Sequence, residues 1–432
     1  MLKKFLRYSS MNIIGMIGLS CYILADTFYI AKALGEKGLT ALNFAIAVYS
    51  LIYGTGLMIG IGGATLFSVT KKSGNKVFTQ SLITGIIFSG GMIFCGVFLS
   101  EDMALWLGAD SSTIEYTAIY IRYILLFSPF YIVNNTVIAF VRNDGNPQLS
   151  MIAMLTSSFS NIILDYIFMF LLQWGMFGAV LATCFSPIIN LLILSLHFIA
   201  KKNSFKVEKS YCYFSIYFMG KILLSGVSAL IGELASAIAL VIFNLILVKN
   251  YGNTAVASYG IIANVGLVIT AVFTGIAQGT QPLASDSFGK HQNEILFRLL
   301  RYACMTALIT AWCLYIFLLW KRQDIAEIFS NGNVVLESMA TKGMTLYFIG
   351  IFFSGINIVA TAFLSAVLEY KTATVISLAR SCIILVPCVL LMNSGFGIIG
   401  VWLSFTVTEI IVFFVTLGGI TKFFTKIRNK SN

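Results

Sequence analysis

The stretch that decides the fold runs from Val141 to Phe168 and reads VRNDGNPQLSMIAMLTSSFSNIILDYIF. It opens with a short polar turn, RNDGNPQ, and continues as an apolar run in which Asn161 and Asp165 are the only polar residues besides hydroxyl side chains. About 20 mostly apolar residues are enough to cross a bilayer as a helix. The stretch therefore predicts a tight loop followed by a membrane-spanning helix that carries an amide and a carboxylate in its interior.

The rest of the chain has the same character. Of its 432 residues, 58% are hydrophobic and only 10% are charged, and the mean hydropathy is +0.91. An ordinary soluble domain carries roughly 25% charged residues. This chain therefore has too few charged residues to cover the surface of a soluble protein. We count twelve apolar runs of spanning length, joined by loops too short to fold as catalytic domains. The composition predicts an all-α polytopic membrane protein with twelve transmembrane helices.

The basic residues give the orientation. The net charge is +11, but the Lys and Arg residues lie between the apolar runs and form no continuous basic face, so we expect no nucleic-acid partner. With the N-terminus inside, the inner segments hold 20 Lys and Arg and the outer segments hold 6. Short loops rich in Lys and Arg stay in the cytoplasm, which predicts that both termini are cytoplasmic. The eight cysteines have no C-x-x-C spacing and are interpreted as apolar fillers.

An internal repeat divides the chain. Gly35 and Gly252 are 217 positions apart, as are Gly62 and Gly279, and GMFGAVLAT in the first half is similar to GFGIIGVWLS in the second. Because each repeat contains six spans, the halves have the same orientation and are expected to be related by a pseudo-twofold axis along the membrane normal. We predict two six-helix lobes, residues 1–200 and 222–432, connected by a cytoplasmic linker at 201–221.

Four acidic residues fall inside the predicted spans, namely Asp26, Asp165, Glu233 and Glu409. A carboxylate at the centre of a span costs about 2.5 to 3.5 kcal/mol on insertion scales, so it usually faces a cavity and marks an ion or proton path. The alternative for each is a protonated acid that bonds a neighbouring helix. Asn161 and Asp165 stand at i and i+4, which places both on one face of their helix.

Together with Asp26 and Thr183, these two residues offer two carboxylates, an amide oxygen and a hydroxyl. Such oxygen ligands suit a small alkali cation, whereas two neighbouring carboxylates favour proton exchange. The residues alone do not choose between Na⁺ and H⁺. The equivalent positions in the second half are Ile383 and Pro387, so the cluster exists in one half only and has the character of a coupling site.

At these residues the chain resembles the multidrug and toxic compound extrusion (MATE) transporters, most closely their MepA-like bacterial branch. The resemblance covers almost the whole chain. It departs from the family in two places. Many family members have a proline in the first span, whereas this chain has none before Pro129, and Glu409 matches no family motif. It is carried by the opening stretch and by four others: YILADTFYIAKALG (22–35), GAVLAT (178–183), GELASAIALVIFNLIL (232–247) and VASYGIIANVGLVITAVFTGIAQGTQPLASDSFG (256–289).

The resemblance implies a protein of the bacterial inner membrane that exports lipophilic cationic drugs by alternating access, driven by inward Na⁺ or H⁺. The family's amino-lobe site for Na⁺ or H⁺ carries over onto Asp26, Asn161, Asp165 and Thr183, with Tyr22 and Asn135 as supporting polar groups. The acid of the carboxy lobe carries over onto Glu233. We expect a monomer, with no cofactor besides the coupling ion.

Three other functions compete with this interpretation. A lipid-linked oligosaccharide flippase of the same superfamily would be expected to carry more cationic residues in its cavity, whereas the spans hold only Arg122 and Arg380 against four acids. A membrane enzyme would need a catalytic motif such as H-E-x-x-H, and the sequence contains none. A major facilitator would have a Gly/Asp/Arg-rich loop after the second span, where this chain has TKKSGNKVF (70–78).

Overall fold

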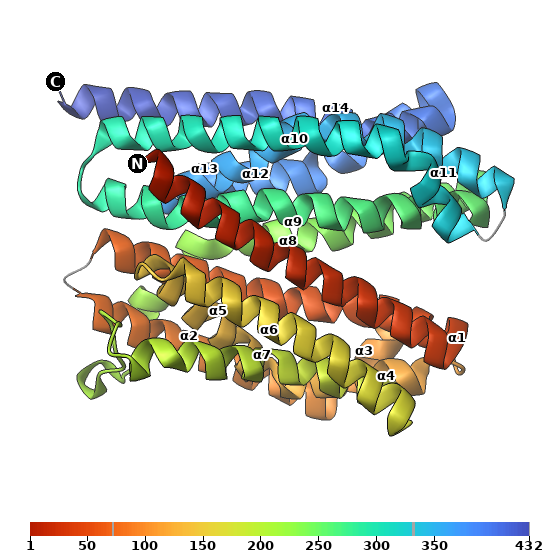
Figure 1. Cartoon of the computed structure of the whole chain (residues 1–432), viewed down its shortest axis with the longest axis horizontal. Helices are drawn as coiled ribbons and strands as arrows, with labels where there is room; N and C mark the ends of the chain where they lie inside the picture. The colour runs from red at the N-terminus through yellow and green to blue at the C-terminus, as the bar shows by residue number, and fades with distance from the viewer. Residues whose placement is uncertain (71–72, 331–332, 432) are drawn as a thin grey trace.

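The computed structural model describes residues 1–70, 73–330 and 333–431, and these residues form helices without any strand (Figure 1). The helices of the first half are α1 (Leu2–Val69), α2 (Gly74–Phe98), α3 (Ser100–Trp106), α4 (Ile114–Leu126), α5 (Ser128–Asn143), α6 (Pro147–Tyr166), the π-helical η2 (Ile167–Leu171) and α7 (Gly175–Ile199). Those of the second half are the short η3 (Lys209–Tyr211), α8 (Ile216–Tyr251), α9 (Asn253–Gly289), α10 (Asn293–Ser330), α11 (Val334–Tyr347), η4 (Phe348–Gly350), α12 (Ile351–Ala366), α13 (Tyr370–Leu378), the π-helical η5 (Ala379–Ile383) and α14 (Leu385–Ser431).

The predicted number of spans is confirmed. Within the described residues, nine helical segments are long and apolar enough to cross a membrane, and the pair α4 and α5, bent by 50°, makes a tenth. Two of these ten, α1 and the segment from α13 to α14, each run through a sharp break and contain two spans. The bend between α4 and α5 has a plain cause, because Pro129 occupies the first turn of α5 and lacks the N–H that would continue the preceding helix.

The breaks occur at glycines that repeat between the halves. Gly35 (φ 63°) separates the first two spans, and Gly252 (φ 77°) separates α8 from α9. Gly175 (φ 55°) and Gly397 (φ 59°), 222 positions apart, do the same before the sixth and twelfth spans. Only glycine adopts this left-handed conformation without a steric penalty. The glycine spacing in the sequence therefore reflects a real repeat of turns.

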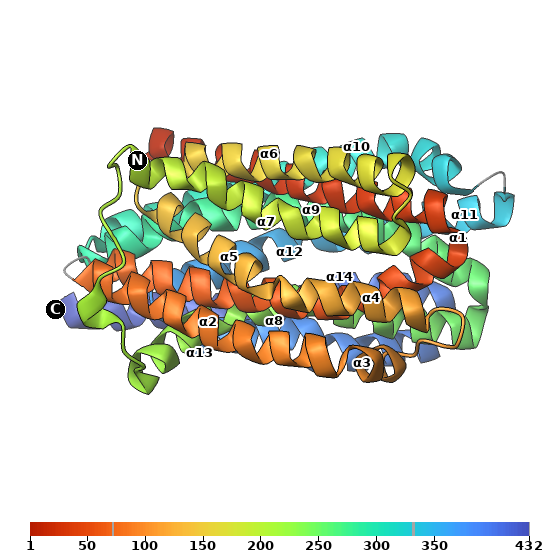
Figure 2. The same cartoon turned by 90° about the horizontal axis from the view of Figure 1, so that it is seen from below.

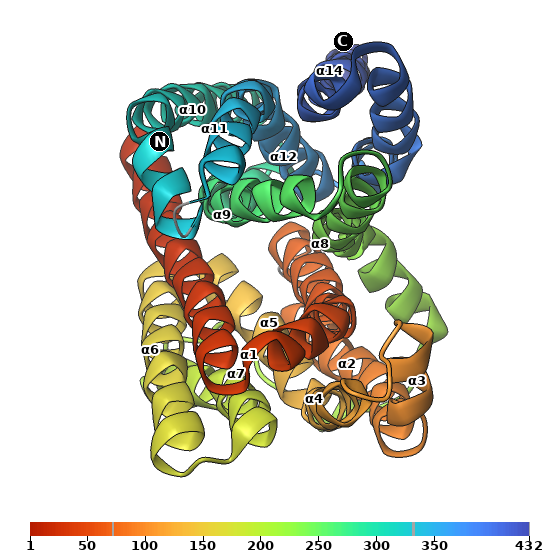
Figure 3. The same cartoon turned by 90° about the vertical axis from the view of Figure 1, so that its right-hand side faces the viewer.

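The helices lie in two groups, which are separate in the end view of Figure 3. The amino-terminal group contains α2 to α7 and the second half of α1, and the carboxy-terminal group contains α8 to α14. Most buried apolar side chains pack into clusters within one group. Apolar side chains that face outward, such as Phe98 and Phe414, are numerous in both groups, as expected for a surface in contact with lipid.

The first half of α1 belongs to both groups. Near its start, the ring of Phe5 lies 6.1 Å from the ring of Tyr302 in α10, whereas further along, Gly18 faces Leu155 of α6. The helix is unbroken up to Gly35. Figure 1 shows it crossing obliquely from one group to the other, so this span links the two halves by packing as well as by sequence.

The two groups approach most closely through glycines. A Cβ atom at Gly226 of α8 would lie 1.8 Å from the carbonyl oxygen of Met58, and one at Gly279 of α9 would lie 2.6 Å from the Cα of Ser9. Because Ser9 is close to the N-terminus and Gly226 follows the linker, both contacts belong to the side of the molecule that carries the two termini (Figure 2). The helix backbones are therefore closely packed on that side of the molecule.

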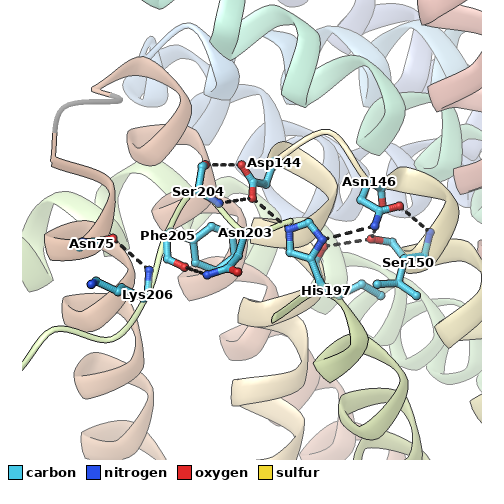
Figure 4. A network of polar contacts seen from close by, with 11 residues as sticks. Asn75, Asp144, Asn146, Ser150, His197, Asn203, Ser204, Phe205 and Lys206 are labelled. Carbon is cyan, nitrogen blue, oxygen red and sulfur yellow. Dashed lines mark hydrogen bonds and ion pairs between the residues drawn. The ribbon is translucent and has the colours of Figure 1, made fainter. Parts of the chain in front are cut away.

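The segment between α7 and α8 is anchored to the amino-terminal group (Figure 4). Asp144 accepts hydrogen bonds from His197 Nε2 (2.9 Å) and from the backbone N–H of Ser204 (2.8 Å), and the Ser204 hydroxyl also bonds this carboxylate. Asn75 accepts from the backbone N–H of Lys206 at 3.0 Å. Further along, Gln80 donates to the carbonyl oxygens of residues 211 and 213, both at 2.8 Å. The linker is thus a fixed strap on one group.

Candidate functional site

Three of the predicted site residues meet where α6 lies against α7. Asn161 and Asp165 lie one turn apart on α6, and Thr183 lies on α7. With its amide oriented so that the nitrogen faces Asp165, the orientation that satisfies both groups, the Asn161 side chain donates to Asp165 Oδ2 at 3.2 Å and accepts from the backbone N–H of Thr183 at 3.3 Å. The Thr183 hydroxyl donates to the carbonyl oxygen of Ala179 at 3.0 Å, which leaves its oxygen lone pairs available to a ligand. All three residues are buried.

Asp26 adds the second carboxylate from α1. It is 6% exposed, Asp165 is 0% exposed, and the charge of Asp26 acts on Asp165. In each residue Oδ1 is buried and has no hydrogen-bond partner in the part of the chain described. A buried carboxylate oxygen without a donor is unfavourable, and Na⁺ or a proton would satisfy it. The arrangement fits either species, and the described residues hold no cluster of three or more His, Cys, Asp or Glu that would suit a transition metal.

A cluster of tyrosines adjoins the acid pair. Tyr22, one turn from Asp26, shares a 2.7 Å hydrogen bond between its hydroxyl and that of Tyr49. The ring of Tyr49 stacks on Tyr53 at 5.9 Å and meets Tyr131 edge-on at 5.9 Å. Tyr131 donates to the carbonyl oxygen of Thr183 at 2.7 Å. The spacing of Tyr49 and Tyr53 on one helix face was the only sequence signal for this cluster, and our sequence analysis did not use it.

Asn135 does not contact the acids. Its side chain donates to the carbonyl oxygen of Tyr53 at 3.4 Å and fills the space beside Gly56 of α1, whereas Gly60 faces the backbone of Asn135. Its small neighbours allow α5 to approach the second half of α1 closely. Asn135 therefore supports the tyrosine cluster, one layer away from the acids.

Glu233 lies at the interface of the two groups. It is half-buried on α8, and a Cβ atom at Gly54 of α1 would lie 3.3 Å from the Cβ of Glu233. No hydrogen bond or ion pair of its carboxylate is found within the described residues. Its charge acts on Tyr53 and Tyr22. An acid of the carboxy-terminal group thus faces the tyrosines of the amino-terminal group.

The fourth intramembrane acid, Glu409, is fully engaged. Arg380 Nε donates to Glu409 Oε1 at 2.6 Å, and Asn357 Nδ2 donates to Glu409 Oε2 at 2.8 Å. Arg380 also donates through Nη2 to Ser354 at 2.6 Å. No local pattern indicates this network, because its residues come from three separate segments of the chain.

One positive charge is in a different place from the one expected. From the sequence, Arg142 was expected in the cytoplasmic segment after the fourth span, and only Arg122 and Arg380 were expected within the spans. The structure continues α5 to Asn143 and buries Arg142 at 3% exposure. The boundary was wrong because the apolar run ends before the helix does.

Comparison with known proteins gives three results. The profile of the MatE family matches residues 12–167 and 228–391. The multidrug export protein MepA of Staphylococcus saprophyticus is 27% identical over 415 residues, covering 95% of this chain and 91% of that protein. The protein of the same name from Staphylococcus haemolyticus is 25% identical over 420 residues, covering 96% of this chain and 92% of its own.

Solved structures agree in fold. A crystal structure of a MATE protein in complex with MaL6 superposes with a TM-score of 0.93 at 20% identity, covering 99% of this chain and 97% of that chain. The outward-facing conformation of a multidrug resistance MATE family transporter of the MOP superfamily gives a TM-score of 0.91 at 20% identity, with the same coverage. At this identity the likeness concerns the fold alone.

Proposed function

The chain belongs to the MatE family of multidrug efflux transporters, which are not enzymes, and from this premise we propose that it exports lipophilic cationic compounds in exchange for Na⁺ or H⁺. The observation that carries the coupling part of the proposal is the pair of unpartnered, buried oxygens on Asp26 and Asp165. Asp165 lies beside the Asn161 amide, which in turn accepts from the backbone N–H of Thr183. A bound Na⁺ would pair with these carboxylate oxygens, and a bound proton would neutralise one of the carboxylates.

Residues 1–200 and 222–432 act as the two lobes of the transport cycle in this proposal, with 201–221 as the linker. The close packing at Gly226 and Gly279 corresponds to a state closed on the cytoplasmic side. Antiport requires that the ion bind the two access states with different affinities, because a ligand with equal affinity shifts no population. Since Asp26 comes from α1, whose first half packs on both groups, a movement between the groups changes the distance between the two carboxylates.

Glu233 binds the transported cation in this proposal. Its carboxylate lies at the interface of the groups without a cationic partner in the described chain, and its charge acts on Tyr53. A desolvated carboxylate attracts an organic cation more strongly than an exposed one, and aromatic faces add cation–π attraction. This combination favours flat, positively charged compounds.

The flippase alternative is less favoured by the charges of the spans. Arg380 is neutralised by Glu409, and Arg122, whose side chain is 43% exposed, pairs with Glu101 at 3.2 Å near the start of α3. Neither arginine is free to hold a pyrophosphate. Arg142 is the remaining buried cation, and it is bound by amides at the side that carries the termini.

Proteoliposomes that contain the purified full-length protein provide the test. Uptake of a lipophilic cationic dye is measured with a Na⁺ gradient and with a pH gradient, imposed separately. We expect Asp165→Asn to abolish gradient-driven uptake while equilibrium dye binding is largely retained. Asp110→Asn, a change of the same kind in an exposed loop, serves as the matched control. Transport at the parental rate by folded Asp165→Asn under both gradients would refute the coupling assignment.

A further inference from the structure

Arg142 is a buried cation without an anionic partner. Its Nη1 donates to Asn12 Oδ1 at 3.2 Å and to Gln278 Oε1 at 2.5 Å, and its Nη2 donates to Gln281 Oε1 at 3.5 Å. All three acceptors are neutral amides, and no carboxylate bonds this guanidinium in the residues that the structure describes. A buried charge is normally paired. The full positive charge of Arg142 therefore acts on its surroundings.

The surroundings include a small polar cavity. A cavity of about 40 Å³ is lined by Arg142, Asn134, Asn190 and Gln278 together with Tyr53 and apolar side chains of α1, α5 and α6. Three polar atoms on its lining residues are buried without a partner in the described chain, namely Arg142 Nε, Asn134 Oδ1 and Asn190 Oδ1. Roughly 10 to 15 Å³ is enough for one water. The cavity thus has the size and the polar groups to hold water.

A row of polar side chains connects this cavity to the acid pair. Thr183, Ser186 and Asn190 stand at i, i+3 and i+7 on α7, which places them on one helix face. The backbone N–H of Thr183 bonds Asn161 of the acid cluster, Asn190 lines the cavity, and the hydroxyl of Ser186 between them is buried and unpartnered in the described chain. Polar groups therefore follow one another from Asp165 to Arg142 through the interior of the amino-terminal group. We call this row the inner column.

We propose that the inner column is the path by which the coupling cation or proton leaves toward the cytoplasm, and that the positive charge of Arg142 is the barrier that keeps cations from crossing it while the inner side is closed. The inference rests on the proposed coupling role of Asp26 and Asp165. A fixed positive charge in a narrow polar passage excludes cations electrostatically, as arginines do in selective pores. Without such a barrier, ions would run down their gradient through the acid cluster without moving cargo.

The partners of Arg142 link this barrier to the transport cycle. Gln278 and Gln281 lie on α9 in the carboxy-terminal group, whereas Arg142 lies on α5 in the amino-terminal group. Gln281 also donates to Thr65 of α1 at 2.8 Å. When the groups separate on the cytoplasmic side, Arg142 loses its α9 partners and is free to leave the column. The barrier then opens only in the state that is open to the cytoplasm, in which ion release is coupled to the transport cycle.

Ion leak in the absence of drug tests the proposal. Proteoliposomes of the full-length protein are loaded with a pH dye or traced with radioactive Na⁺, and passive flux is measured under a fixed potential without any cargo. We expect Arg142→Gln to raise the leak by about tenfold or more, and Arg142→Lys, which keeps the charge, to remain as tight as the parent. Arg122→Gln removes an exposed arginine and is the matched control.

Two further variants keep the test decisive. Asn190→Asp places a carboxylate in the same cavity and should produce a leak without altering Arg142, so it also serves where Arg142→Gln does not fold. Adding Asp165→Asn to Arg142→Gln should suppress the leak, because the path passes the acids. A tight Arg142→Gln protein, an equally leaky Arg142→Lys, or a leak unaffected by Asp165→Asn would each overturn the proposal. A failure of the coupling assignment itself is recognised separately, by normal dye uptake in the single variant Asp165→Asn.

Discussion

Arg380 and Glu409 form an ion pair inside the carboxy-terminal group, with Arg380 Nε 2.6 Å from Glu409 Oε1. Glu409 is 1% exposed, and its second oxygen accepts from Asn357. The acid is therefore compensated by a side chain of the protein itself. This distinguishes it from Asp26 and Asp165, each of which retains an unpartnered oxygen.

We predict that breaking this pair destabilises the protein and that removing it entirely does not. Glu409→Gln should lower the free energy of unfolding by about 3 to 5 kcal/mol, because it leaves a buried guanidinium without a counter-charge. The double variant Arg380→Met, Glu409→Met should recover most of that loss. Thermal unfolding in detergent measures both. A double variant that folds well but no longer pumps dye would instead assign Glu409 to the transport cycle.

Glu233→Gln should weaken export of cationic dyes more than export of neutral ones. The carboxylate has no cationic partner in the described chain, so its charge is available to the cargo. Loss of one favourable charge interaction of about 1.4 kcal/mol corresponds to a tenfold weaker apparent affinity. Dye competition in vesicles provides the measurement, with Glu369→Gln, an acid paired with Lys426 far from the interface, as the control. Equal loss for both dye classes would point to a structural role for Glu233.

Cysteine labelling of intact cells should reproduce the predicted orientation. The carboxylate of Asp110 accepts hydrogen bonds from Ser112 and Thr113, which hold the pKa of Asp110 below its usual value, so the neighbouring exposed Ser111 is the better reporter position. In a variant without native cysteines, Ser111→Cys should react with an impermeant reagent from outside, and Lys206→Cys should react only after permeabilisation. The opposite pattern would reverse the orientation derived from Lys and Arg.

The linker should become accessible to protease when its anchor is removed. Asp144→Asn replaces a charged acceptor that holds His197 and Ser204, and hydrogen bonds to charged groups contribute about 1.5 to 3 kcal/mol each. We expect trypsin to cleave among the linker lysines roughly tenfold faster or more in inside-out vesicles, whereas Glu294→Gln, in a surface pair on α10, should have no effect. Unchanged cleavage would show that the other anchors, namely the hydrogen bonds of Asn75 and Gln80 and the aromatic packing around Phe205, hold the strap without Asp144.

The contribution of Glu208 to the same strap should depend on pH in one direction. Hydrogen bonds from the side chains of Asn75 and Ser210 lower the pKa of Glu208, so its stabilising effect is present above the unfolded value of about 4.3 and is lost as the pH falls through the lower folded value. The difference in trypsin resistance between the parent and Glu208→Gln should therefore stay constant from about pH 7 to 5. A difference that disappears within that window would contradict the assignment.

The sequence predicted the parts of this structure that follow from local periodicity. The pairing of Asn161 with Asp165 follows from helical spacing, and the turns at Gly35 and Gly252 follow from the repeat of glycines. Contacts between distant segments were not accessible in this way. Arg380 meets Glu409 across 29 positions, a distance set by how whole helices pack and not by any local pattern.

The site shows the same division. The acids and amides of the amino-terminal group were found because polar residues are rare in apolar runs. Tyr49 and Tyr131 were missed because tyrosine is common in membrane helices and only the packing turns these two toward Tyr22 and Thr183. Arg142 was misplaced because hydropathy locates the end of an apolar run, whereas backbone hydrogen bonding decides where the helix ends.

The oblique course of α1 has a consequence for how the chain is assembled. This span is synthesised well before α9 and α10, yet some of its neighbours, among them Gly279 and Tyr302, belong to those later helices. Until then its small and polar face around Ser9 and Asn12 has no docking surface on α9. This span is thus made well before it finds its full set of neighbours, and its docking on α9 and α10 is a late step of assembly. Truncations that stop before α9 should consequently be recognised as immature by membrane quality-control proteases, even though every helix of the first half is present.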